Sequence, residues 1–169
     1  DENSLVVCDA STNNPIFWSY LELDHPGSFY QSLGSSLGWG LSAAVGAKMA
    51  APDKTVIALM GDGGWMFSNP LATYQLSLSQ GAPFLTIVLN NQKYAAIQEA
   101  VQGLAPEGVA RRSQDYPACG LAEAGYYSRI GEAAGLWSRL VRLPEELPDV
   151  LEQALSRVQR GKSAMVEVW

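Results

Sequence analysis

The sequence predicts a doubly wound α/β domain, with a mostly parallel sheet and helices on both faces. Two observations carry this prediction. Apolar, β-rich runs alternate with stretches of helical character, which is the chain order of strand–helix–strand units with right-handed crossovers. The runs at residues 55–62 and 84–91 are almost continuously hydrophobic. That pattern is typical of strands buried on both faces of a parallel sheet.

The predicted elements follow from local signals along the chain. The strands are expected at residues 4–10, 55–62, 84–91, 138–143 and 164–169. The helices are expected at residues 35–50, 69–80, 122–135 and 144–161. The second helix has Asn69 as a candidate N-cap, Pro70 at its first position and Gly81 just past its end. Residues 101–121 show no clear period and are predicted to form a long, functional or mobile loop.

Composition narrows the classes of function. The chain has 169 residues, a net charge of -6 and 17% charged residues, which fits one domain with a large core or a covered oligomer interface. Arg111 and Arg112 are the only adjacent basic pair, so a nucleic-acid partner is not expected. No apolar run reaches the roughly 18 residues of a membrane span. Cys8 and Cys119 form no motif, which predicts a reduced, cytoplasmic protein.

Polar residues follow two predicted strands at their carboxyl ends. Asp62 stands among Gly61, Gly63 and Gly64 after the first buried run, and the pair Asn90–Asn91 closes the second. Ligands of open α/β sheets bind at this edge. If the two strands are neighbours, a carboxylate and a carboxamide converge there. The alternative is two ordinary turns, with Asp62 as a solvated helix cap.

A hard cation with a diphosphate would fit such a pair. Mg²⁺ commonly takes one or two protein oxygens together with substrate phosphates. The glycines allow the backbone to approach a diphosphate closely, with amides pointing inward. An unrelated nucleotide-binding domain is a weaker alternative, because no G-x-G-x-x-G fingerprint is present.

The same residues carry a family resemblance. Gly61-Asp62-Gly63, an interval of about 26 residues, and Asn90-Asn91 resemble the cofactor motif of thiamine diphosphate-dependent enzymes. The segment from Pro26 to Gly63 is similar to the corresponding region of benzoylformate decarboxylase and acetolactate synthase-like enzymes. The resemblance implies that residues 1–169 form a single diphosphate-binding (PP) domain. It implies thiamine diphosphate and Mg²⁺ as cofactors.

The resemblance also assigns roles to individual residues. The implied Mg²⁺ ligands are the side chains of Asp62 and Asn91 and the carbonyl of Lys93. Leu37 would be the apolar wedge that bends the cofactor, and the carbonyl of Ser35 would face its aminopyrimidine amine. The diphosphate contacts are expected from Thr12, Asn13, Gly61, Gly63, Gly64, Tyr94 and Ala95.

No catalytic residue is assigned to this chain. In the family the activating glutamate comes from a separate pyrimidine-binding (PYR) domain, which we expect to be absent here. The chain should therefore act on a 2-oxo acid, as a decarboxylase or carboligase, only with a PYR-domain subunit or the remainder of a longer polypeptide. A hetero- or homo-oligomer, such as a dimer of dimers, is the expected assembly. The alternative is a non-catalytic or regulatory cofactor-binding module.

Two features depart from the family pattern. Asn91 follows Asp62 by 29 positions, about two more than expected for the decarboxylases. Gly64 stands where a serine is common, so we expect one hydroxyl contact to phosphate to be missing.

Overall fold

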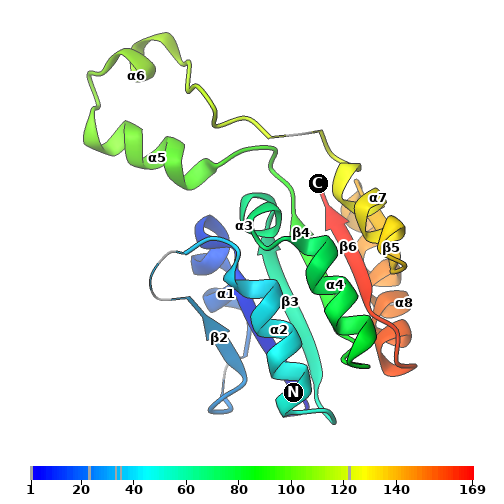
Figure 1. Ribbon diagram of the computed structural model, residues 1–169. Helices are drawn as coiled ribbons and strands as arrows, with labels where there is room; N and C mark the ends of the chain where they lie inside the picture. The colour runs from blue at the N-terminus through cyan, green and yellow to red at the C-terminus, as the bar shows by residue number, and fades with distance from the viewer. Residues whose placement is uncertain (1, 23, 33, 35, 122) are drawn as a thin grey trace.

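The computed structural model describes residues 2–22, 24–32, 34, 36–121 and 123–169. Within them, six strands form one sheet in the order β2-β1-β3-β4-β6-β5 (Figure 1). Every pairing is parallel, so the predicted fold class is confirmed. The strands are β1 (Ser4–Asp9), β2 (Phe29–Gln31), β3 (Thr55–Gly61), β4 (Leu85–Leu89), β5 (Trp137–Val141) and β6 (Ala164–Val168).

Helices connect these strands. Those in the first half are the 3₁₀ turn η1 (Ser11–Asn13), α1 (Asn14–Tyr20), α2 (Trp39–Ala50), α3 (Asp62–Phe67) and α4 (Pro70–Ser79). Those in the second half are α5 (Ala95–Leu104), α6 (Val109–Ser113), α7 (Tyr126–Ala133), the 3₁₀ turn η2 (Pro144–Glu146) and α8 (Leu147–Gln159).

Both faces of the sheet are covered. One face packs on α2, α3, α4 and α7, where Leu41, Trp65, Tyr74 and Tyr127 belong to one buried cluster. The opposite face packs on α8 near β5 and β6, and on α1 near β1. Because helices cover both faces, ligands can reach the sheet where its strands begin and where they end.

A buried polar chain crosses the larger core. The indole nitrogen of Trp65 donates to the Tyr74 hydroxyl at 3.0 Å, and that hydroxyl donates to the Thr86 hydroxyl at 3.2 Å. All three residues are buried. Because the Trp65 and Tyr74 donors both meet acceptors, these hydrogen bonds hold α4 against β4 without leaving either donor unsatisfied.

The strand order places a switch point beside β1. The chain runs from β1 outward to β2 at the edge, and then returns to β3 on the other side of β1. The carboxyl ends of β1 and β3 therefore lie side by side, in register Asp9↔Met60. A crevice at such a switch point is the usual ligand site of open α/β sheets.

Several predicted boundaries were wrong. The region 101–121, expected to be a loop, contains the last turn of α5 and all of α6, and these two helices stand away from the sheet in Figure 1. No residue of α5 or α6 is buried, and the parts of these helices that lie in this region are too short for a helical pattern to be recognised in the sequence. The helix expected from residue 35 begins at Trp39, because Gly38 before it takes a left-handed conformation (φ 90°).

Short elements were missed altogether. The strand β2 has three residues, α1 has seven and α3 has six. Each is shorter than the stretch over which hydrophobic periodicity can be recognised, about four residues for a strand and about eleven for a helix. The prediction for Ser35 lies outside the described residues.

No helix in the described residues has the length and apolar character needed to cross a membrane. Cys8 and Cys119 are both buried and free. Burial raises the pKa of the Cys8 thiol to about 11, so this thiol stays protonated and unreactive near neutral pH.

Candidate cofactor and metal site

The two halves of the sequence motif meet at the carboxyl edge of the sheet. β3 and β4 are hydrogen-bonded neighbours, with Gly61 opposite Leu89. Asp62 and Asn90–Asn91 therefore follow adjacent strand ends, as predicted. Beside them is a cavity of about 270 Å³.

The cavity brings together residues that are distant in sequence. Four segments line it: the end of β1 with the turn after it, the segment before α2, the end of β3, and the end of β4 with the first turn of α5. Of the predicted cofactor residues and metal ligands, those that line it are Thr12, Asn13, Leu37, Gly61, Gly63, Gly64, Asn91, Lys93, Tyr94 and Ala95. Asp62 does not line the cavity and is itself buried, with 3% of its surface exposed.

The Asp62 carboxylate has one satisfied oxygen and one without a partner. Oδ1 accepts the backbone N–H of Gly63 at 2.9 Å, whereas Oδ2 is buried and has no hydrogen-bond partner in the described part of the chain. Burial raises the pKa of Asp62, and the backbone N–H groups of Gly63 and of the 91–93 turn oppose that rise. A buried carboxylate oxygen without a donor is unfavourable, and a bound cation would relieve it.

The two asparagines lie in different environments. Asn91 is exposed, and its Oδ1 accepts the backbone N–H of Lys93 at 3.1 Å. Asn90 is buried, with its Nδ2 donating to Glu167 at 2.7 Å and its Oδ1 accepting from the Gln92 N–H at 3.0 Å. Only Asn91 lines the cavity, so the pair consists of one candidate ligand and one structural residue.

The residues present fit a Mg²⁺ site of mixed oxygen ligands. No group of three or more His, Cys, Asp or Glu side chains that could hold a metal is found among the described residues, so a cluster of such side chains is excluded there. Asp62, Asn91 and the carbonyl of Lys93 supply a carboxylate, an amide and a backbone oxygen. Hard cations that also bind phosphate take this type of set.

Gly63 and Gly64 allow close approaches that a side chain would prevent. A Cβ on Gly63 would lie 2.7 Å from the Tyr94 ring, and a Cβ on Gly64 would lie 2.7 Å from the carbonyl oxygen of Asp9. The glycine at position 64 therefore has a local cause, since the end of β1 lies directly against that backbone.

Comparison with known proteins decides the family. Residues 9–168 match the family described as "Thiamine pyrophosphate enzyme, C-terminal TPP binding domain"; thiamine pyrophosphate (TPP) is another name for thiamine diphosphate. The chain belongs to this family.

The relatives of this TPP-binding domain are named for different reactions. It is 29% identical over 167 residues to the acetolactate synthase isozyme 3 large subunit of Escherichia coli, covering 98% of this chain and 28% of that protein. It is 35% identical over 133 residues to a probable 2-ketoarginine decarboxylase of Pseudomonas aeruginosa, covering 77% of this chain and 21% of that protein. The chain thus spans less than a third of the length of these relatives.

A solved structure supports the same assignment. The thiamine diphosphate-dependent 4-hydroxybenzoylformate decarboxylase of Rhodococcus jostii RHA1 superposes with a TM-score of 0.82 at 26% identity. The match covers 99% of this chain and 29% of that one.

Asp9 is a site residue of the TPP-binding domain that sequence reasoning missed. Its Oδ2 accepts the backbone N–H groups of Gly38 at 2.9 Å and Gly40 at 3.1 Å. This carboxylate therefore caps α2 from the end of β1 and fixes the approach of Leu37 to the cavity. An acid closing an apolar strand was the available signal, as it was for Asp62.

Tyr127 lies in the core beside the site. Its hydroxyl is buried and has no hydrogen-bond partner among the described residues, and its ring centroid is 4.9 Å from that of Trp65. Burial, with the negative charges of Asp62 and Glu167 as smaller causes, raises the pKa of Tyr127 to about 12. Two buried polar atoms in this part of the TPP-binding domain, the Tyr127 hydroxyl and Asp62 Oδ2, thus have no hydrogen-bond partner among the described residues.

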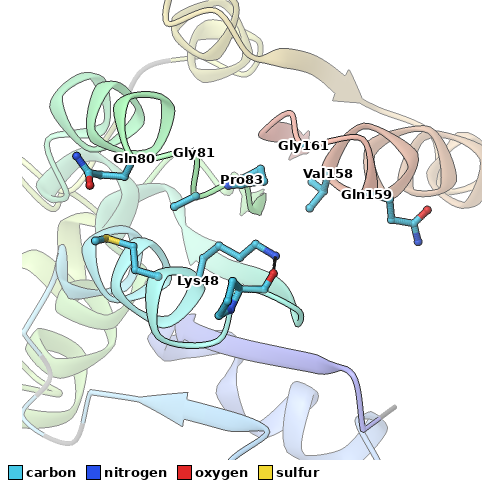
Figure 2. Close-up of a pocket in the computed structure, with 10 residues that line it drawn as sticks. Lys48, Gln80, Gly81, Pro83, Val158, Gln159 and Gly161 are labelled. Atoms are coloured by element: carbon cyan, nitrogen blue, oxygen red, sulfur yellow. Dashed lines mark hydrogen bonds between the residues drawn. The ribbon is translucent and has the colours of Figure 1, made fainter.

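A larger hollow, of about 440 Å³, involves none of the predicted site residues. Figure 2 shows it between the ends of α2, α4 and α8, close to where β3, β4 and β6 begin. The Lys48 ammonium there donates to the carbonyl oxygens of Pro52 and Lys54, both at 2.7 Å. The Lys48 charge thus closes a turn, and the predicted cofactor residues line the smaller cavity instead.

Proposed function

We propose that this domain binds thiamine diphosphate together with Mg²⁺ and is one component of a 2-oxo acid decarboxylase or carboligase. The observation that carries the proposal is the buried Asp62 Oδ2, which has no hydrogen-bond partner among the described residues and belongs to a residue whose neighbours Gly61 and Gly63 line the cavity together with other predicted cofactor residues. A buried carboxylate oxygen without a donor destabilises the domain when no cation is bound, and binding of a cation to that oxygen would stabilise the domain.

Three oxygens would hold the metal ion. Asp62 and Asn91 would bind through their side chains and Lys93 through its backbone carbonyl. The backbone N–H groups of the 91–93 turn lie close enough to the Asp62 carboxylate to oppose the rise of its pKa, so the turn and the acid are already adjacent. The ion would in turn bind phosphate oxygens of the cofactor.

The lining residues divide between the two ends of the cofactor. Gly63 and Gly64 would donate backbone N–H groups to the diphosphate, with Thr12, Asn13, Tyr94 and Ala95 around it. Leu37 is half-buried and lines the same cavity, where its apolar side chain would support the bent cofactor. Bound thiamine diphosphate would supply the electron sink for loss of carbon dioxide from a 2-oxo acid.

A partner would complete the active site. Asp9 is the one acidic side chain among the described residues that line the cavity, and its carboxylate already caps α2. The activating glutamate must then come from elsewhere, which supports a PYR domain in another subunit or in the rest of a longer chain. α5 has no buried residue, and its Ile97 and Leu104 are exposed by 54% and 88%. Such a face beside the cavity suits a covering domain.

A cofactor and substrate assay on the assembled protein tests the proposal. This chain, in the full polypeptide or with its PYR-domain partner, should bind one thiamine diphosphate per site in the presence of Mg²⁺. It should also release carbon dioxide from at least one member of a panel of 2-oxo acids. Cofactor binding without turnover of any 2-oxo acid would favour the non-catalytic module, and no cofactor binding would contradict the proposal.

A further inference from the structure

Glu167 is a buried carboxylate near the carboxyl end of β6, the strand beside the edge strand β5. It lies in β6, opposite Val88 of β4 and Leu140 of β5, and none of its surface is exposed. The ion pairs found among the described residues are His25–Asp24 and Arg139–Glu132, so no cation offsets this charge there. A buried carboxylate without a cation requires hydrogen-bond donors.

Three donors surround it, and they come from two separate segments. Oε2 accepts the backbone N–H of Ser128 at 2.8 Å, and Oε1 accepts that of Gly125 at 2.8 Å. Both groups belong to the start of α7, which has no side-chain cap from its own segment. Oε1 also accepts from the Asn90 Nδ2 at 2.7 Å. Glu167 therefore joins the end of β4 to the beginning of α7.

Asn90 transmits this constraint to the turn that follows β4. Its backbone N–H donates to the Val168 carbonyl at 2.8 Å, and its Oδ1 accepts the Gln92 N–H at 3.0 Å. Gln92 has a φ of 60°, a left-handed conformation that is unfavourable for a non-glycine residue. The contacts of Asn90 help to hold this unfavourable geometry.

The geometry of the turn matters for Asp62. The backbone N–H groups of Asn91, Gln92 and Lys93 lie close enough to the Asp62 carboxylate to oppose the rise of its pKa. The same turn carries Asn91 and the Lys93 carbonyl, which are the other candidate metal ligands. A chain of contacts thus runs from Glu167 through Asn90 to the residues that would hold the ion.

We propose that Glu167 is a positioning residue for the metal-binding turn, acting through its hydrogen bond to Asn90. It does not contact the cavity, so its effect is on the orientation of Asn91 and Lys93 and not on the cofactor directly. This inference rests on the proposed Mg²⁺ site. Residues that orient metal ligands in this way typically change metal affinity by about 10- to 100-fold when they are replaced.

A double-mutant cycle tests it in the full polypeptide or complex. Glu167→Met removes all three acceptor contacts at similar length, and Asn90→Ala removes the link while leaving Glu167 its two contacts to α7. Each single variant should weaken Mg²⁺ binding, measured with saturating thiamine diphosphate, by about tenfold or more. The double variant should bind Mg²⁺ no more weakly than the single variant with the lower affinity, because both substitutions interrupt the same series of contacts. If the double variant instead loses Mg²⁺ affinity by the product of the two single losses, the inference is overturned.

A control and a second readout separate positioning from general loss of stability. Thr86→Val, in the neighbouring β4, removes a buried hydroxyl contact to Tyr74 and should leave Mg²⁺ affinity within about twofold. Amide hydrogen exchange at residues 91–93 should be faster in Asn90→Ala than in Thr86→Val, without any ligand.

If Glu167→Met does not fold, Asn90→Ala decides alone, and unchanged exchange and affinity would reject the inference. If the wild type binds no Mg²⁺ or cofactor, the proposed function fails, while the exchange data still report on the turn.

Discussion

The Asp9 carboxylate accepts the backbone N–H of Gly38 at 2.9 Å and so connects the end of β1 to the start of α2. These residues are 29 positions apart, and the segment that carries Leu37 lies immediately before Gly38. The approach of the predicted wedge residue to the cavity therefore depends on a side chain at the end of another element.

Asp9→Ala should weaken both the fold and cofactor binding. Loss of a helix cap typically costs about 0.5–2 kcal/mol, and two N–H donors would lose their acceptor here. Urea unfolding should show a lower midpoint, and thiamine diphosphate should bind less tightly in the assembled protein. Asp53→Ala, at an exposed acid in the turn before β3, is the matched control and should change neither quantity. Equal cofactor affinity in Asp9→Ala and Asp53→Ala would refute this role.

Gly64→Ser, which introduces the residue expected there from the family resemblance, should destabilise this domain. The added Cβ would lie 2.7 Å from the Asp9 carbonyl oxygen, and relieving such an overlap costs about 1–3 kcal/mol. A lower unfolding midpoint in urea is expected. Gly46→Ser provides the comparison, because a Cβ at that position in α2 meets no atom within 4 Å. A Gly64→Ser protein as stable as wild type would show that the end of β1 can move aside.

Tyr74 should make the fold sensitive to high pH. Burial raises the pKa of Tyr74 from 10.0 to about 12. Between these values the unfolded chain has lost the phenol proton and the folded chain has kept it, so stability falls as pH rises from about 10 to 12. A shift of this size corresponds to about 2–3 kcal/mol. Tyr74→Phe should have a shallower loss of stability over that range, and Tyr20→Phe, at an exposed phenol, should match wild type. If the stability of Tyr74→Phe falls with pH in parallel with that of wild type, the Tyr74 hydroxyl is not the cause of the loss.

How far the sequence predicted the site depends on which contacts are local. The convergence of Asp62 with Asn91 could be predicted, because both end apolar strands and such strands pair side by side. The roles of Asp9 and Glu167 could not, because their donors lie between 29 and 77 positions away. The helical content of residues 101–121 was not predicted either, since only the last turn of α5 and the five residues of α6 fall in this region, and each is too short to show a helical pattern.

The most direct test of the central claim compares wild type with Asp62→Asn by thermal unfolding of the assembled protein. Without ligands, Asp62→Asn should unfold at the same or a higher temperature near neutral pH, because it removes a buried charge whose pKa is raised by burial. With Mg²⁺ and thiamine diphosphate together, the wild type should gain several degrees, and Asp62→Asn should gain none. An equal rise in both proteins, or no rise in the wild type, would contradict the assignment of Asp62 as the metal-binding acid of this domain.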